Sequence, residues 1–159
     1  MNSIIIYYSY QNNTRKLANY IKEALNCQIL ELLPVVPYSD NYDDVVALGE
    51  NEETKNVRPE LQTNIPNLDS YDTVILCTPT WWYNIAPVMI SFLEKYPLTN
   101  KDIYVLATNG GFGLGKGKEC LEELCGKESI HSVLEVPFDE DEMEISMDVV
   151  NAWIESIKK

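Results

Sequence analysis

A short segment near the start of the chain consists only of residues with hydroxyl or amide side chains. It follows an apolar run and leads directly into a segment with helical periodicity. The first amide N–H groups of a helix have no partner within the helix, so such a start is a favourable phosphate site. The alternative is an ordinary polar turn in which Asn12 or Asn13 is the N-cap. The candidate phosphate-binding residues are Ser9, Tyr10, Gln11, Asn12, Asn13 and Thr14.

Three consecutive aromatic residues follow a later apolar run. Large aromatic side chains in a loop at a sheet edge are unusual unless a ligand or a partner covers them. Their flat faces can stack on a flat ligand ring such as an isoalloxazine, whereas the alternative is that they pack into the core. The segment that we expect to contact the ring comprises Thr78, Pro79, Thr80, Trp81, Trp82, Tyr83 and Asn84.

A glycine-rich segment follows the next apolar run. Glycine lets the backbone approach a ligand closely and present N–H groups to the edge of a ring. Residues 110–116 also match the G-x-x-x-x-G-K pattern of nucleotide-binding loops, but Gly117 replaces the hydroxyl residue that would bind magnesium. The pattern therefore does not favour nucleotide hydrolysis. The candidate ring contacts in this segment are Thr108, Asn109, Gly110, Gly111, Phe112 and Gly113.

Five short apolar runs rich in branched residues alternate with segments of helical periodicity, which predicts a parallel sheet. The predicted strands are residues 4–8, 28–32, 73–77, 103–107 and 132–136. A chain of 159 residues has room for one domain, residues 1–159. The expected fold is a doubly wound α/β domain with a five-stranded parallel sheet and helices on both faces. Ligands bind such sheets at the carboxyl ends of strands where strand order reverses, so the three candidate segments should meet there.

Helical spacing also predicts which side chains are buried. The last helix is the clearest, because its apolar residues form one stripe and Ser146 or Asp148 can cap its start, so Trp153 is expected in the core. The connection from Pro34 to Asn67 is too long for a plain loop and is expected to contain a short helix around residues 43–53. The stripe of the last helix is Val149, Val150, Trp153, Ile154 and Ile157.

Together, the three candidate segments resemble the three cofactor-contact loops of the flavodoxin family. Residues 9–14 lead from a strand into a helix, residues 78–82 end in paired tryptophans and residues 108–111 end in two glycines, and the resemblance covers nearly the whole chain. It implies flavin mononucleotide (FMN) as the cofactor, with its phosphate at the first loop and its ring between the other two. It also implies the flavodoxin-like strand order 2-1-3-4-5. Neither a catalytic side chain nor a metal is implied, because the reactive centre is the cofactor.

Two positions depart from the flavodoxin pattern. First loops of the family usually read Thr-Gly-Asn-Thr, whereas Gln11 and Asn12 stand where threonine and glycine are expected. Asparagine adopts a left-handed backbone more readily than most non-glycine residues and glutamine donates through its amide, so loss of phosphate binding does not follow. Many flavodoxins also place glycine after the second-loop tryptophan, where this chain has Tyr83. That difference keeps a two-electron reductase open as an alternative.

The chain is strongly acidic, with 12 Lys and Arg against 25 Asp and Glu and a formal net charge of −13. This charge excludes nucleic acid as a favourable partner. It favours redox protein partners, a reductase and an acceptor, that dock on an acidic surface, although it also fits a role in solubility alone. No apolar stretch reaches the roughly 18 residues that cross a bilayer, and no basic segment precedes the first apolar run. We therefore expect a cytoplasmic protein without membrane insertion, as a monomer or weak dimer.

The remaining reactive residues have simpler interpretations. The four cysteines form neither a C-x-x-C pair nor a zinc-ligand spacing with the one histidine, His131, so we expect free thiols, mostly buried, and a structural histidine. The acidic run of residues 139–142 is expected to be a solvated turn rather than a metal site, with a contribution to partner docking as the alternative.

Three functions fit these observations. The first, which we favour, is an FMN-binding electron carrier. The second is an FMN-dependent NAD(P)H:quinone-type oxidoreductase, in which a hydride reaches the flavin and leaves to an acceptor. The third is a non-catalytic member of the fold. A phosphoacceptor receiver domain is close to excluded, because Ser9 and Thr78 stand where its acidic residues would be needed.

Overall fold

A single sheet forms the centre of the computed structural model, which describes residues 1–45, 47–48 and 57–159. The strands follow the order β2-β1-β3-β5-β6-β7, and β4 pairs with β3 outside this path. Five neighbouring strands are parallel. The predicted doubly wound sheet is confirmed, as is the order of its five parallel strands. These strands are β1 (Ser3–Tyr7), β2 (Gln28–Glu31), β3 (Thr73–Trp81), β5 (Asp102–Asn109) and β6 (Ile130–Asp139).

Two further strands of two residues each extend the sheet. Both β4 (Asn84–Ile85) and β7 (Glu142–Met143) are antiparallel to the strand that precedes them. They pair with the carboxyl-terminal ends of β3 and β6, beyond the predicted strand ends. Residues 78–81, expected in a loop, therefore belong to β3, because the hairpin with β4 and the pairing of Pro79 with Thr108 on β5 continue the strand.

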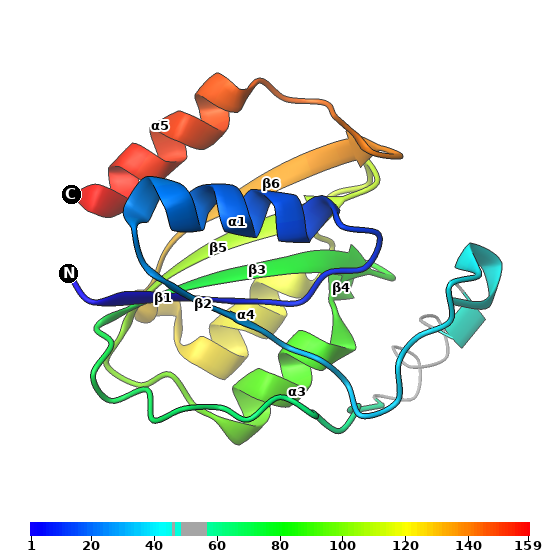
Figure 1. The fold of residues 1–159 in the computed structure, drawn as a ribbon, viewed down its shortest axis with the longest axis horizontal. Helices are drawn as coiled ribbons and strands as arrows, with labels where there is room; N and C mark the ends of the chain where they lie inside the picture. The colour runs from blue at the N-terminus through cyan, green and yellow to red at the C-terminus, as the bar shows by residue number, and fades with distance from the viewer. Residues whose placement is uncertain (46, 49–56) are drawn as a thin grey trace.

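Helices cover both faces of the sheet. In Figure 1, α1 and α5 lie on one face and α3 and α4 on the other. Residues 42–45 and 47–48 are helical, in agreement with the predicted short helix, whereas residues 46 and 49–53 of that prediction lie outside the described residues. The helices are α1 (Asn13–Leu25), α3 (Pro87–Lys95), α4 (Gly117–Cys125), the short 3₁₀ helix η1 (Lys127–Ser129) and α5 (Met147–Lys158).

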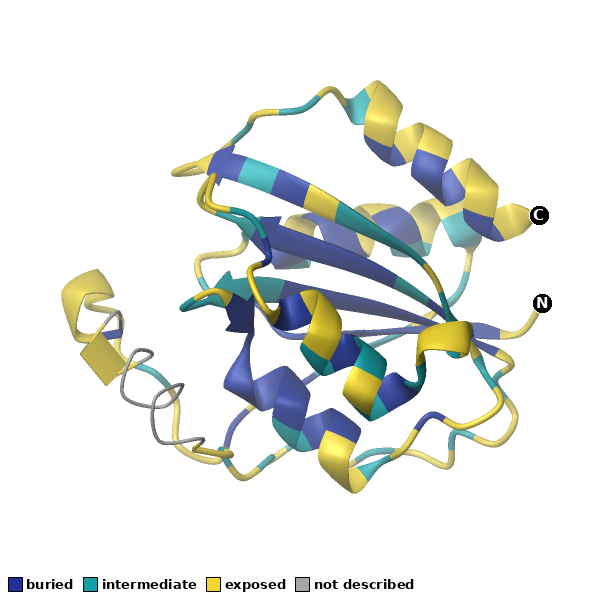
Figure 2. Cartoon of the chain, turned by 180° about the vertical axis from the view of Figure 1, so that it is seen from behind, coloured by how far each residue is buried: buried dark blue, intermediate teal, exposed yellow. Residues whose placement is uncertain are grey.

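The core consists of two apolar layers, one on each side of the sheet. Successive side chains of a strand point to opposite faces, so Ile4 and Ile6 of β1 pack with α3 and α4, while Ile5 packs with α1 and α5. Figure 2 shows the central strands mostly buried and the helices exposed only on their outer sides. Strands buried on both faces explain why the sequence shows continuous apolar runs rather than alternation.

The last helix begins and packs largely as predicted. The Ser146 hydroxyl caps it by accepting the amide N–H of Asp148 at 3.1 Å. Trp153 is 8% exposed, and its indole N–H donates to the Ser132 hydroxyl at 2.9 Å, so its predicted place in the core is confirmed. The prediction for Val149 is wrong: it is 45% exposed. Each residue turns the helix by about 100°, which carries position 149 off the face that Val150 shares with Trp153.

The ends of the chain lie together, away from the carboxyl ends of the strands. Strand β1 starts at residue 3, and α5 runs back across the sheet to residue 158, so both termini lie at the amino-terminal ends of the parallel strands (Figure 1). Among the helices within the described ranges, none is long and apolar enough to span a bilayer.

Candidate functional site

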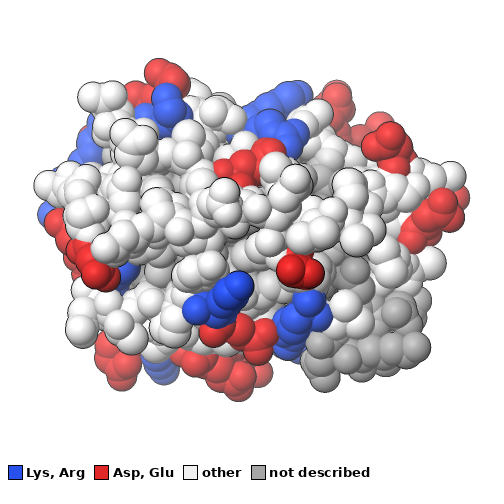
Figure 3. Space-filling view, turned by 60° about the horizontal axis from the view of Figure 1, so that its bottom comes forward, with Lys and Arg blue, Asp and Glu red and all other residues white. Residues whose placement is uncertain are grey.

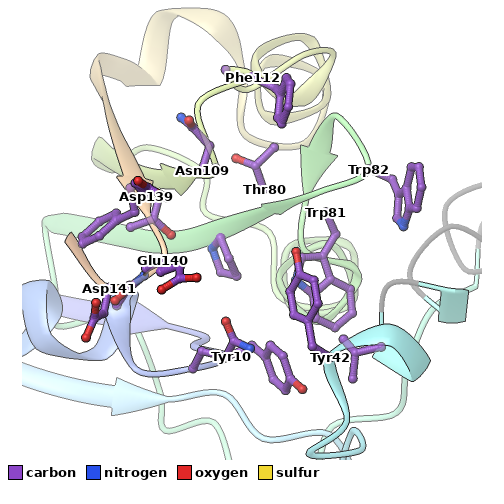
Figure 4. Close-up of a pocket in the computed structure, with 18 of the residues that line it drawn as sticks. Tyr10, Tyr42, Thr80, Trp81, Trp82, Asn109, Phe112, Asp139, Glu140 and Asp141 are labelled. Atoms are coloured by element: carbon purple, nitrogen blue, oxygen red, sulfur yellow. The ribbon is translucent and has the colours of Figure 1, made fainter. Parts of the chain in front are cut away.

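A cleft of about 980 Å³ lies where β1, β3 and β5 end. All three predicted segments line it, as expected for the point where strand order reverses on either side of β1. Figure 4 shows side chains from these separate segments converging on one space. The predicted residues that line the cleft are Tyr10, Gln11, Asn13, Pro79, Thr80, Trp81, Trp82, Tyr83, Thr108, Asn109, Gly110, Phe112 and Gly113.

The first loop reaches α1 through two left-handed residues. Gln11 has φ 63° and Asn12 has φ 76°, and Asn12 is the N-cap of α1 although its side chain caps no amide. The amide of Arg15 donates to the Ser9 hydroxyl at 3.0 Å. Within the described part of the chain, no acceptor contacts the amide N–H groups of residues 11–14. Such a run of unpaired donors at a helix start is a ready anion site.

An aromatic cluster holds Trp81 in place beneath the cleft. The Trp81 ring makes edge-to-face contacts with Tyr8, Tyr10 and Tyr38 at centroid distances of 6.0, 6.3 and 4.6 Å. The Tyr10 hydroxyl donates to the carbonyl of Ser39 at 2.7 Å, which ties the first loop to the long connection. Burial, aided by the negative charge of Asp40, raises the pKa of Tyr10, so its hydroxyl stays protonated at neutral pH.

The β3–β4 turn consists of Trp82 and Tyr83, both with left-handed backbones. Their φ angles are 51° and 60°, the signature of a type I′ hairpin turn, which normally takes Asn-Gly. Each bulky residue in this conformation costs of the order of 1–2 kcal/mol. The turn is held from below, because the Lys116 amide donates to the Tyr83 carbonyl at 2.8 Å. The second loop is therefore fixed against the third.

The third loop is held by one of its own side chains and by one from β6. The Asn109 side-chain oxygen accepts the Gly111 amide at 2.8 Å, and the Leu114 amide donates to the Glu135 carboxylate at 2.7 Å. Phe112 is 80% exposed, and its ring meets Tyr83 edge-to-face at 6.5 Å. Two aromatic rings from different loops therefore stand together at the rim.

Six predicted site residues do not line the cleft. Contact with the cofactor stays a prediction for all the predicted site residues. Thr14 and Thr108 share a buried hydroxyl–hydroxyl hydrogen bond of 2.8 Å that joins α1 to β5. The Thr78 hydroxyl accepts the Ala86 amide at 3.3 Å, in the β3–β4 hairpin. These hydrogen bonds hold the loops in shape. The six residues are Ser9, Asn12, Thr14, Thr78, Asn84 and Gly111.

The structure also adds lining residues that sequence reasoning missed. Two come from the helical residues 42–45 of the long connection, and four come from the end of β6 and the turn to β7. The Asn13 side chain donates to the Glu140 carbonyl at 2.8 Å, which fastens this turn to the first loop. The acidic run was a visible signal, but its position depends on the tertiary fold. The added residues are Tyr42, Val45, Phe138, Asp139, Glu140 and Asp141.

The cleft carries negative charge on one side. Asp139, Glu140 and Asp141 lie on the side opposite Trp82 in Figure 4, and none of the described lining residues is Lys or Arg. On the face shown in Figure 3, by contrast, acidic and basic side chains are interspersed. The described residues include no cluster of three or more His, Cys, Asp or Glu side chains that could hold a metal ion.

Comparison with known proteins identifies the family. A sequence model of the family described as Flavodoxin matches residues 2–157. The chain belongs to the flavodoxin family. A search of curated proteins finds no match.

Solved structures share the fold of this flavodoxin at low sequence identity. A candidate flavoprotein from Bacteroides uniformis is 21% identical with a TM-score of 0.81, and the alignment covers 99% of this chain and 98% of that one. A flavoprotein from Lactobacillus acidophilus, solved in complex with FMN, is 17% identical with a TM-score of 0.74, covering 96% and 97%. The azoreductase AzrA is 13% identical with a TM-score of 0.52, covering 97% and 96%.

The cleft of this flavodoxin fits FMN. Its volume of about 980 Å³ lies at the upper end of the range for small-molecule sites. The unpaired amides of residues 11–14 suit a phosphate, and Trp81, Trp82 and Tyr83 offer aromatic surface for the ring. The family match supports FMN as the cofactor, as the sequence predicted.

The other reactive groups of this flavodoxin lie outside the cleft. His131, at the start of β6, pairs with Asp102 at 2.7 Å and stacks on Tyr104. None of the four cysteines forms a disulfide; Cys77 and Cys125 are buried, whereas Cys27 and Cys120 are partly exposed. Burial raises the pKa of Cys125 to about 12 and that of Cys77 further, so both are unreactive thiols at neutral pH.

Proposed function

We propose that this flavodoxin binds FMN in the cleft and transfers electrons between protein partners that dock on the acidic rim of the cleft, formed by Asp139, Glu140 and Asp141. Bound FMN would supply the redox chemistry. The side chains of the chain bind and orient the cofactor: the first loop holds the phosphate through amide N–H groups, and the turn at Trp82 and Tyr83 covers the ring. Release of the flavin and mass determination test the cofactor, because recovery of FAD as the main species would contradict FMN.

The negative charge of the rim is the observation that supports docking of protein partners. Asp139, Glu140 and Asp141 stand beside the cleft, and the described lining residues include no cation to offset them. The formal net charge of −13 adds a long-range field of the same sign. Such a field attracts a basic protein surface and repels NADPH, which is itself negatively charged. Both effects favour a protein donor over a free nicotinamide.

Neutralising the rim tests this proposal. The variant Asp139→Asn/Glu140→Gln/Asp141→Asn keeps the backbone contact between Glu140 and Asn13, which involves the main-chain carbonyl. The matched control, Glu23→Gln/Glu128→Gln/Glu155→Gln, neutralises three exposed acidic side chains that do not line the cleft. In stopped-flow experiments at low salt, we measure the rate at which a flavodoxin reductase reduces the flavin. We expect this rate to fall roughly tenfold in the rim variant and less than twofold in the control.

A salt series distinguishes long-range electrostatic attraction of the partner from other effects of the rim variant. The difference between the two variants should shrink as salt rises above about 0.15 M, where the Debye length falls to about 8 Å. Equal rates for rim variant and control at low salt would contradict docking at this rim. Fast, saturable reduction of wild-type protein by NADH or NADPH alone would contradict the carrier function itself.

A second candidate is an FMN-dependent NAD(P)H:quinone-type oxidoreductase. The observation that favours it is the exposed aromatic pair of Tyr83 and Phe112, which are 55% and 80% exposed at the rim. A flat, uncharged acceptor such as a quinone can stack on such rings. The same stopped-flow experiment decides between the two functions, because only the oxidoreductase requires rapid reduction by the nicotinamide without a protein partner.

A further inference from the structure

Arg15 occupies a position in α1 that disfavours a cation. Asn12 is the N-cap, so Arg15 is the third residue of the helix, in the first turn, where the helix dipole is positive. Its guanidinium contacts Asn12 and Glu31, and Arg15 is not among the residues that line the cleft. A basic residue at this place needs a compensating partner.

Glu31 provides that partner. One terminal nitrogen of the Arg15 guanidinium donates to both oxygens of the Glu31 carboxylate, at 3.0 and 2.8 Å, and Nε donates at 3.3 Å. The Tyr7 hydroxyl donates to the same carboxylate at 2.9 Å. Tyr7 and Glu31 are register partners on β1 and β2, so two strands fix the position of the guanidinium. Hydrogen bonding to Glu31 raises the pKa of Arg15, which keeps it charged.

The same guanidinium holds the first loop. Its other terminal nitrogen donates to the side-chain oxygen of Asn12. An N-cap asparagine normally uses this oxygen to accept an amide N–H of the first helical turn. Here Arg15 takes the oxygen instead, while the Arg15 amide is taken by the Ser9 hydroxyl at 3.0 Å. The amides of Asn13 and Thr14 therefore keep no protein acceptor within the described residues.

The backbone of the loop explains why such support is needed. Gln11 and Asn12 are consecutive left-handed residues where neither is glycine. Residues in this region cost free energy and persist only when their surroundings hold them. The Arg15 guanidinium donates to the Asn12 side chain, and the Arg15 amide donates to the Ser9 hydroxyl. One residue therefore holds the loop on both sides of Gln11.

We propose that Arg15, held by Glu31 and Tyr7, is a positioning residue that keeps the amides of the first loop directed at the phosphate of FMN. The proposal rests on FMN binding in the proposed function. Arg15 acts through Asn12 and not by contact with the phosphate. Its loss therefore affects the phosphate-bearing ligand and leaves recognition of the flavin ring intact.

Paired titrations of the full-length protein, freed of flavin, test this role. FMN and riboflavin share the same ring, and riboflavin lacks the phosphate, so the ratio of their dissociation constants isolates phosphate recognition. For Arg15→Met and for Glu31→Gln we expect FMN affinity to fall roughly three- to tenfold, as for a partly exposed charged hydrogen-bond network. Riboflavin affinity should stay within about twofold of the wild-type value, a smaller change than the loss of one hydrogen bond would cause.

A matched control is the ion pair of Arg58 and Glu94, 2.7 Å apart and similarly exposed, which lies outside the cleft. Arg58→Met should leave the ratio of FMN to riboflavin affinity unchanged. Urea unfolding of each variant shows how much global stability it has lost. A variant that loses affinity for both flavins equally has only a structural role, and that result would overturn the proposal.

The Glu31 variant distinguishes positioning from direct contact. If Arg15 contacted the phosphate itself, Glu31→Gln would release the cation toward the ligand and FMN affinity would rise or stay unchanged. Positioning requires that it fall, because the guanidinium loses its anchor. Wild-type levels of FMN binding in both variants would refute this inference alone. A wild-type chain that binds neither flavin would refute the proposed function and this inference with it.

Discussion

Replacing Gly115 by alanine should destabilise the fold and disturb the cleft, because no side chain fits at this position. An alanine Cβ would lie 2.3 Å from the Tyr83 carbonyl oxygen and 2.6 Å from the Tyr83 Cβ. Neither atom is the end of a flexible side chain, so the whole β3–β4 turn has to move. Gly115 also has φ +60°, a conformation that alanine adopts only at a cost.

The two effects can be estimated separately. A non-glycine residue with a left-handed backbone costs about 1–2 kcal/mol. Overpacking against rigid neighbours costs about 1–3 kcal/mol. Gly115→Ala should therefore lower the free energy of unfolding by about 2–5 kcal/mol, a large part of the 5–15 kcal/mol that is typical of a domain.

Two neighbouring glycines give a matched series for urea unfolding. Gly111 has φ +102°, but an alanine Cβ there would meet nothing within 4 Å. Gly111→Ala should therefore lower the free energy of unfolding only by the cost of the left-handed backbone. Gly110 has neither a positive φ nor a neighbour within 4 Å, so Gly110→Ala should change stability by at most about 0.5 kcal/mol. Equal losses for Gly115→Ala and Gly111→Ala would show that contact with Tyr83 does not constrain the turn.

Three further outcomes are expected. Alanine in place of the tryptophan that contacts the ring, Trp81 or Trp82, should weaken FMN binding by about 1–3 kcal/mol in titrations of the flavin-free protein, and wild-type affinity in both variants would contradict stacking. Trp153→Phe removes the hydrogen bond to Ser132 and should lower the free energy of unfolding by about 1 kcal/mol in urea, whereas no change would mean that this bond adds nothing. Because burial raises the pKa of Cys77, this thiol should resist iodoacetamide at pH 8 until the protein unfolds, and mass spectrometry of the native protein would reveal an early reaction.

The parallel part of the fold could be predicted because its signals are local. Branched runs such as residues 73–77 and 103–107 are buried on both faces, which makes them continuous and easy to find. The ends of these strands could not be predicted in the same way. Whether residues 78–81 form strand or loop depends on the hairpin with β4, and that hairpin uses Trp82 and Tyr83 where a turn signal normally has Asn-Gly.

The site was predictable where each part follows its own strand. The loops after β1, β3 and β5 had to meet because the topology brings their carboxyl ends together. Tyr42 had no such signal, since it reaches the cleft from the long connection between β2 and β3. The proposed role of Arg15 was equally hidden, because its anchor Glu31 is distant in the sequence and becomes its neighbour only in the folded chain.

The arrangement of the termini has a practical consequence for linking this protein to other components. Both ends of the chain lie at the amino-terminal ends of the strands, whereas the cleft lies at their carboxyl ends. A fusion partner, an affinity tag or a tether to an electrode attached at either end would therefore leave the entrance to the cleft facing outward. Immobilised in this way, the molecules would present the cleft side to solution.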